Sequence, residues 1–167
     1  MNRTDIAYLS ATELSRLIRS KEISPVELTE LYLDRIDNLD FQYNSYLTVT
    51  REEALLAAQR AEQEIARGKY KGPMHGLPVA VKDQFWTKGV RTTGASRILM
   101  DFIPDEDANV IANLKQSGAV ILGKTNMTEF AITGFSHRFS TPRNPWNINM
   151  YAGGSSSGSA AATAGYL

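Results

Sequence analysis

The chain has 167 residues, the length of one ordinary domain, and its 43% hydrophobic and 22% charged residues exclude a disordered or fibrous protein. Eighteen basic residues balance eighteen acidic ones, so electrostatics gives no reason to expect nucleic acid or an anionic membrane surface as a direct partner. The absence of cysteine excludes disulfides, cysteine nucleophiles and thiolate metal sites, and two histidines, His75 and His137, are too few for a multi-histidine site; we expect no metal and no cofactor.

The chain starts without a targeting signal. The segment from Met1 to Ser10 lacks the apolar core of a signal peptide, and no later run approaches the roughly 18 apolar residues of a membrane span. We therefore expect a soluble, cytoplasmic protein.

Residues 1–68 are predicted to form a helical amino-terminal segment. Three times, a serine or threonine that can cap a helix stands three residues before a glutamate: Ser10, Ser24 and Thr50. Apolar residues at helical spacing follow each cap, and Gly68 closes the last stretch. The helices are predicted over residues 10–20, 25–39 and 51–67.

Residues 69–167 are predicted to begin an α/β core. Short apolar runs predict buried strands over 78–82 and 119–122. Between them, residues 107–117 read as a helix capped by Asp107. A helix between two apolar strands is typical of a parallel sheet, so the fold class is α/β.

The last part of the chain combines a loop with a tightly packed turn. Residues 134–152 are rich in Ser, Thr, Pro and Asn and are predicted to be a loop. Residues 153–159 form a glycine-serine run that feeds an alanine-rich helix, and such small side chains predict a close approach of that helix to a neighbour. The chain then stops at Tyr166 and Leu167 without a polar tail, so we expect 1–167 to be a single, truncated domain.

Gly118 to Thr125 satisfies the pattern of a phosphate-binding Walker A loop, but the residues contradict that reading. The four residues between the glycines are Ala, Val, Ile and Leu, which suit a paired strand, and the element before Gly118 is a helix. We interpret the segment as a helix end and a buried strand, followed by a strand-to-helix turn at Gly123 to Asn126.

Gly154 to Gly158 matches the nucleophile elbow of α/β-hydrolases, with Ser156 at its centre. The residues before it, Asn147 to Tyr151, make a poor apolar strand, and both histidines precede the serine instead of following it. A flexible linker is an equally poor reading, because an apolar small-residue helix follows at once. We infer that the turn holds something specific.

Lys82 stands at the end of the first predicted strand. Taken alone, it reads as a lysine that reaches water at the sheet edge, as most lysines do. The alternative is a desolvated lysine with a lowered pKa, able to act as a base.

Taken together, these segments resemble the amidase signature family, from about Ser10 to the last residue. After the helical preface, the motifs that carry the resemblance are Gly76 to Asp83, Gly89 to Thr93, Gly118 to Ala131, Thr141 to Trp146, and Gly153 to Ala160. The resemblance implies the first part of the family's mixed-sheet α/β core.

The resemblance also implies a Ser–cis-Ser–Lys triad. Lys82 would be the base and Ser155 the bridging serine, with a cis peptide bond between Gly154 and Ser155 and with Gly153 and Gly154 shaping the loop. The nucleophilic serine and the oxyanion-hole backbone would lie in a second glycine-serine motif beyond residue 167. Ala131 would lie on the substrate side.

One residue departs from the family's usual run. Ser157 stands where a glycine is usual, and if that position needed a positive φ the serine would cost about 1 kcal/mol.

The implied reaction is hydrolysis of the C–N bond of a small, linear amide through an acyl-enzyme, and we expect the chain alone, without the nucleophile, to be inactive. The alternative is the glutaminase A subunit of glutamyl-tRNA(Gln)/aspartyl-tRNA(Asn) amidotransferase, which uses the same triad to release ammonia from glutamine. Glu129 to Ala131 fits both, whereas Ile132 to Arg138 is closer to general amidases. A truncated, inactive piece that pairs with a missing half is a further reading.

Overall fold

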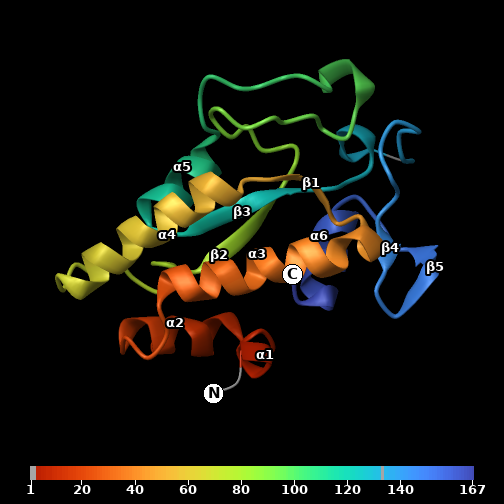
Figure 1. Ribbon diagram of the computed structural model, residues 1–167. Coiled ribbons are helices and arrows are strands. Elements are labelled where there is room, and N and C mark those ends of the chain that lie inside the picture. The colour runs from red at the N-terminus through yellow and green to blue at the C-terminus, as the bar shows by residue number, and fades with distance from the viewer. Residues whose placement is uncertain (1–2, 133) are drawn as a thin grey trace.

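The computed structural model describes residues 3–132 and 134–167 (Figure 1). Met1 and Asn2, at the start of the segment searched for a signal peptide, and Thr133, within Ile132 to Arg138, lie outside the described residues. No helix in the described ranges is long and apolar enough to cross a membrane.

The described residues form helices and strands in a mixed order along the chain. The helices are α1 (Arg3–Ile6), α2 (Ala11–Arg19), α3 (Pro25–Tyr43), α4 (Arg51–Ala66), α5 (Asn109–Gln116) and α6 (Ser157–Gly165), with 3-10 turns η1 (Arg97–Leu99) and η2 (Glu129–Ala131). The strands are β1 (Tyr46–Val49), β2 (Pro78–Lys82), β3 (Val120–Thr125), β4 (Arg143–Asn144) and β5 (Asn147–Tyr151).

The main sheet has three strands in the order β1-β3-β2. β2 runs parallel to β3, as the apolar runs predicted, and β1 runs antiparallel to β3. Position 123, within β3, requires a glycine because a Cβ there would overlap the carbonyl oxygen of Thr48 in β1. Because β2 and β3 run parallel, their carboxyl ends meet at one edge of the sheet, where Lys82 pairs with Thr125.

Two clusters of buried apolar side chains hold the helices to one another and to the sheet. In Figure 1, α2 lies below α3, and the sheet and α4 lie above α3. The cluster between the helices contains Leu14, Ile18, Leu28, Leu31, Ile65 and Leu77. The cluster against the sheet contains Leu33, Ile36, Ala54, Ala58, Val120, Leu122, Ala162 and Leu167. The helix α3 thus belongs to both clusters, and the mixed α/β class predicted from the sequence is confirmed.

The amino-terminal helices follow their predicted start signals closely. Ser10 makes the full capping box with Glu13, and Ser24 caps α3, which begins at Pro25. α3 runs to Tyr43 instead of ending near residue 39. Thr50 precedes α4 without capping it, since its hydroxyl donates to the carbonyl of Ile121. β1 has no counterpart in the prediction.

The predicted cap of α5 is wrong. The helix begins at Asn109, and Ala108 at its cap position makes no side-chain hydrogen bond. The carboxylate of Asp107 instead accepts from the backbone N–H of Lys88 at 2.7 Å and from Lys115 Nζ at 2.8 Å. Asp107 therefore holds the loop before the helix in place.

Two further predictions are wrong in their secondary structure. β3 continues through Thr125, so Gly123 to Asn126 is not a strand-to-helix turn; the Asn126 side chain donates to the carbonyls of Asn44 and Ser140. Residues 134–152 are not all loop, because β4 and β5 form an antiparallel hairpin.

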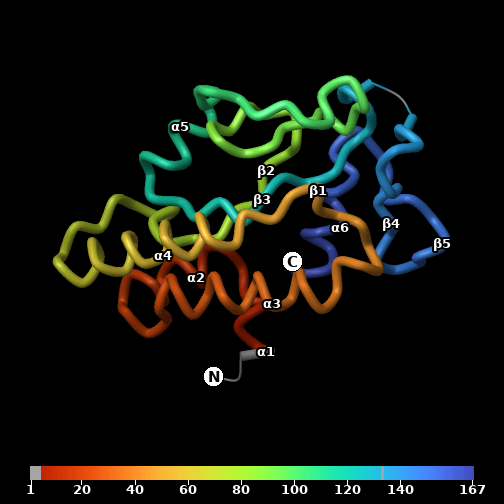
Figure 2. The backbone as a smooth tube through the Cα atoms, turned by 45° about the horizontal axis from the view of Figure 1, so that its top comes forward, coloured from red at the N-terminus to blue at the C-terminus, as the bar shows by residue number. Residues whose placement is uncertain are grey.

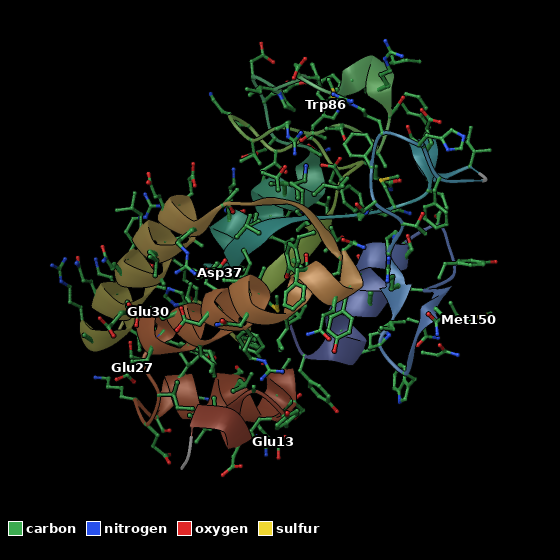
Figure 3. The ribbon with its side chains drawn as sticks, turned by 45° about the vertical axis from the view of Figure 1, so that its right-hand side comes forward. Glu13, Glu27, Glu30, Asp37, Trp86 and Met150 are labelled. Atoms are coloured by element: carbon green, nitrogen blue, oxygen red, sulfur yellow. The ribbon has the colours of Figure 1, made fainter. Side chains whose placement is uncertain are left out.

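The periphery of the fold carries exposed apolar side chains. The connection from β2 to α5, residues 83–108, extends away from α1 and α2 (Figure 2). Trp86 lies in it, packed edge-to-face on Phe102, and Met150 lies on the hairpin at another side of the molecule (Figure 3). All of β5 is exposed, so this hairpin projects from the body of the described structure.

A buried ion pair lies where this connection leaves the sheet. Asp83 and Lys124 are both fully buried, with Lys124 Nζ 3.5 Å from Asp83 Oδ1. The ammonium also donates to the carbonyl of Phe85 at 2.8 Å and to Thr92 Oγ1 at 2.6 Å. Asp83 Oδ2 accepts from the backbone N–H and the hydroxyl of Thr93. Burial lowers the pKa of Lys124 to about 8, although the charge of Asp83 opposes that shift.

We predict that Gly158→Ala destabilises the fold by about 3 kcal/mol or more, because overpacking against backbone cannot relax. Gly158 lies in the first turn of α6, where a Cβ would overlap backbone atoms of Asn126 and Ser45. The matched control is Gly68→Ala: its φ is +78° but the space around it is open, so we expect a loss of about 1–2 kcal/mol. Urea unfolding measures both, and equal losses would contradict the close approach of α6.

We predict that the stabilities of the wild type and Lys124→Met diverge with pH. The folded chain releases the Lys124 proton near pH 8, whereas the unfolded chain holds it up to its ordinary value of 10.5. Between these values the unfolded state binds more protons, so the wild type's free energy of unfolding rises relative to the variant by up to about 1.4 kcal/mol per pH unit. Urea unfolding of both proteins from pH 7 to pH 10 tests this; a constant difference would contradict it.

Candidate active site

The side chains of Lys82 and Ser155 meet, although they lie 73 residues apart in the chain. Lys82 is the last residue of β2, and Ser155 lies in the loop that leads into α6. Lys82 Nζ donates to Ser155 Oγ at 2.7 Å. The backbone N–H of Asp83 donates to the carbonyl of Thr125 at 3.0 Å, so the strand pairing extends past Lys82 and holds its backbone.

The glycine-serine loop presents Ser155 through its backbone conformation. The peptide bond between Gly154 and Ser155 is cis, and Gly153 has a φ of +81°. A Cβ on Gly154 would come within 3.0 Å of the Thr128 methyl, and the backbone N–H of Thr128 donates to the carbonyl of Ser155 at 3.1 Å. Ser157 is the buried first residue of α6 and has no positive φ, so the strain considered for it does not arise.

The amine of Lys82 has a hydroxyl as its hydrogen-bond partner and no carboxylate. Within residues 3–132 and 134–167, Lys82 takes part in no ion pair. Burial lowers the pKa of Lys82 from its ordinary value of 10.5, and no charge opposes the shift. A lower pKa increases the neutral fraction of the amine near pH 7, and the neutral amine is the form that accepts a proton.

A second pair of hydroxyls joins the same strand ends to α6. Thr125 Oγ1 lies 2.7 Å from Ser159 Oγ, and either oxygen can be the donor. Side chains alternate between the two faces of a strand, so Thr125 and Lys124 point to opposite faces of the sheet. The contacts of Lys82 and Thr125 with the loop and α6 thus lie on one face, and the Asp83–Lys124 ion pair lies on the other.

Ala131 lies in η2, where the backbone takes an unusual conformation. Phe130 and Ala131 have φ values of 50° and 61°, the left-handed region that non-glycine residues seldom adopt. The N–H of Phe130 donates to the carbonyl of Gly94 at 2.8 Å, which helps to hold the turn.

Ala131, Gly153, Gly154 and Ser155 line one cavity of about 650 Å³. The other lining residues are Thr128, Ile132, Gly134, Phe135, Thr141 and Tyr151. None of these lining residues is charged. The candidate residues from the sequence therefore share one uncharged, partly aromatic cavity, with Lys82 behind Ser155.

Neither histidine is part of this site. His75 is buried elsewhere: its Nδ1 accepts from the backbone N–H of Lys71, and its Nε2 lies 3.0 Å from the carboxylate of Glu64. Burial lowers the pKa of His75. It lines a separate cavity of about 400 Å³, and His137 is exposed. In the part of the chain that the structure describes, no three His, Cys, Asp or Glu side chains are grouped to hold a metal ion.

Two features of the site were not predicted from the sequence: the ion pair on the opposite face of the sheet from the Lys82–Ser155 contact, and part of the cavity wall. The Asp83–Lys124 ion pair has one signal in the sequence, because a lysine within the buried run Val120 to Thr125 needs a buried partner. The cavity positions of Phe135 and Tyr151 have no such signal, since they depend on how the hairpin packs.

Comparisons with known proteins show which family this chain is similar to. The model of the family described as Amidase matches residues 27–167. A glutamyl-tRNA(Gln) amidotransferase A subunit from Geobacter metallireducens is 51% identical over 93% of this chain and 32% of its own length. A putative amidase, AmiD, from Mycobacterium bovis is 46% identical over 97% of this chain and 34% of its own length.

Solved structures share the fold as well. The peptide amidase from Stenotrophomonas maltophilia superposes with a TM-score of 0.87 at 34% identity, over 93% of this chain and 34% of that protein. The chain thus spans about a third of the length of the relatives it matches. The family match, the fold and the ordered motifs together show that this chain belongs to the amidase signature family.

Proposed function

We propose that Lys82 and Ser155 are the base and the relay of a Ser–cis-Ser–Lys triad that hydrolyses a carboxamide C–N bond. The observation that supports this most is the 2.7 Å hydrogen bond from Lys82 Nζ to Ser155 Oγ. The lowered pKa of Lys82 adds support, because a relay that ends on an amine needs that amine neutral.

In the proposed reaction, a nucleophilic serine beyond residue 167 loses its proton to Ser155 Oγ as it attacks the amide carbonyl. Ser155 passes its own proton to the neutral Lys82. The same path returns a proton to the leaving nitrogen, the C–N bond breaks, and an acyl-enzyme remains. Water then attacks the ester with the same base, so that amide and water yield acid and amine.

The cavity that Ser155 lines supports a substrate with an uncharged portion next to the amide. Its wall from this chain includes Ala131, which we propose to contact the substrate, together with the aromatic rings of Phe135 and Tyr151. Gly153 and Gly154 would shape the loop that faces the amide. We further propose that residues 1–167 belong to one amidase domain: the mainly helical residues 1–68 add strand β1 to the sheet, and residues 69–167 form the first part of the α/β core.

A second candidate function is the glutaminase reaction of an amidotransferase A subunit. The observation that favours it is the 51% identity to a protein of that name. The proton path would be the same, with glutamine as the substrate and ammonia as the leaving group. The described residues that line the cavity carry no charge, so the charged ends of glutamine would need partners from elsewhere in the enzyme.

We predict that Lys82→Ala and Ser155→Ala each lower kcat by about 10³-fold or more, because members of a triad act as a unit. The measurement uses an active enzyme that contains this sequence and extends to the length of its relatives. The substrates are simple aliphatic and aryl amides, with glutamine in parallel.

The matched control is Ser156→Ala, which removes the neighbouring, exposed hydroxyl and should leave kcat within about twofold. Retention of activity by Lys82→Ala or Ser155→Ala would contradict the proposed function. Turnover of glutamine alone would favour the amidotransferase reaction over the general amidase.

We also predict that the 167-residue chain by itself hydrolyses none of these amides at a measurable enzymatic rate. Lys82 and Ser155 can move a proton, but the proposed nucleophile and oxyanion donors lie elsewhere, and loss of one such donor alone typically costs about 10²–10³ in rate. The assay compares the purified chain with the longer enzyme. Turnover by the short chain that disappears in Ser155→Ala would mean that a serine of this chain carries out the attack.

A further inference from the structure

We propose that Asp83 and Lys124 are positioning residues that hold Lys82 in place for proton transfer. The inference rests on the proposed role of Lys82 as the base. It concerns the face of the sheet opposite the Lys82–Ser155 contact, where neither charged group touches the cavity.

The ion pair crosslinks the two strand ends that carry the site. Asp83 directly follows Lys82 in the chain, and Lys124 directly precedes Thr125, the strand partner of Lys82. A movement of the Asp83–Lys124 contact therefore moves the backbone of Lys82 relative to β3. Lys82, the proposed base, lies on one face of this edge, and Lys124, in its ion pair with Asp83, lies on the other.

The pair also anchors the chain that follows β2. Lys124 Nζ holds the carbonyl of Phe85 and the hydroxyl of Thr92, while Asp83 Oδ2 accepts from Thr93. Both ends of the stretch from residue 85 to residue 93 are thus tied back to the strand end.

The anchoring reaches the cavity through the backbone. The N–H of Gly94 donates to the carbonyl of Asp83 at 3.3 Å, and the carbonyl of Gly94 accepts from Phe130, next to Ala131. The same group of contacts therefore supports Lys82 on one side and the η2 turn on the other.

Stability alone does not explain a charged pair at this place. Asp83 and Lys124 are both fully buried, and Asp83 Oδ1 has no hydrogen bond, only the ammonium at 3.5 Å. Removing two charges from water is costly, and apolar residues of similar volume often give equal or greater stability. Directional contacts to defined atoms, in contrast, specify one position of the strand end, which an apolar contact does not.

The test uses the longer, active enzyme and two variants. Asp83→Asn removes the carboxylate charge, and Thr92→Val removes one acceptor of Lys124 while keeping both charges. We expect kcat to fall about 10²-fold in Asp83→Asn, as for a misplaced catalytic group, and about tenfold in Thr92→Val. KM should stay within about twofold, since none of these residues lines the cavity.

A spectroscopic measurement separates positioning from general damage. The ¹⁵N chemical shift of the Lys82 amine, followed over pH, reports its protonation directly. In both variants we expect the pKa of Lys82 to rise toward its ordinary value, because a loosened strand end admits water. The matched control is Asp107→Asn, which removes the charge from the partly exposed pair with Lys115 and should change neither kcat nor the Lys82 titration.

The double variant Asp83→Asn/Lys124→Met decides between the two roles. A purely structural pair predicts that removing both charges restores stability and kcat together, whereas a positioning pair predicts restored stability with kcat still low. If Asp83→Asn does not fold, the inference is tested by the kcat of Thr92→Val and of the double variant. Normal kcat in Thr92→Val and the double variant, with Lys82→Ala inactive, overturns this inference alone; an active Lys82→Ala overturns the proposed function.

Discussion

The parallel pairing of β2 with β3 is the constraint on which the site depends. It brings the carboxyl ends of two apolar strands to one edge and sets Lys82 opposite Thr125. The loop before α6 reaches this edge because Gly158 lets the helix lie directly on backbone. A lysine at an ordinary strand end would extend into water; here the loop covers it and offers a hydroxyl instead of a carboxylate.

The two faces of the sheet differ in charge at this edge. Among the described residues, the Lys82 amine has one hydrogen-bond partner, the hydroxyl of Ser155, and burial lowers its pKa. Burial also lowers the pKa of Lys124, but the charge of Asp83 opposes that shift, and Phe85 and Thr92 accept hydrogen bonds from the Lys124 amine. Two lysines on neighbouring strands thus have different chemistry because their surroundings differ. The arrangement places negative charge beside Lys124 and leaves Lys82, the proposed base, beside a hydroxyl.

The sequence predicted much of this fold and part of the site. Capping serines and apolar spacing placed α2, α3 and α4, because those signals are local and physical. The apolar runs placed β2 and the start of β3. β1 was not predicted, since its half-exposed residues form a strand only against β3, far along the chain. The hairpin was not predicted, since β4 has only two residues and all of β5 is exposed. Likewise, the contact of Lys82 with Ser155 followed from the family resemblance, and no local pattern demanded it. Burial of Lys124 depends on the covering stretch from residue 85 to residue 93.

The hairpin of β4 and β5 bears on the cavity wall in a further way. Tyr151, the last residue of β5, lines the cavity and packs edge-to-face on Phe135, although both it and Met150 beside it are largely exposed. Neighbouring strand residues face opposite sides, so a slip of one residue in the hairpin would exchange the ring for a neighbouring side chain. The register already shifts between Arg143 and Asn144. Changes in the short turn at Pro145 and Trp146 can therefore alter which side chain lines the cavity, without touching Lys82 or Ser155.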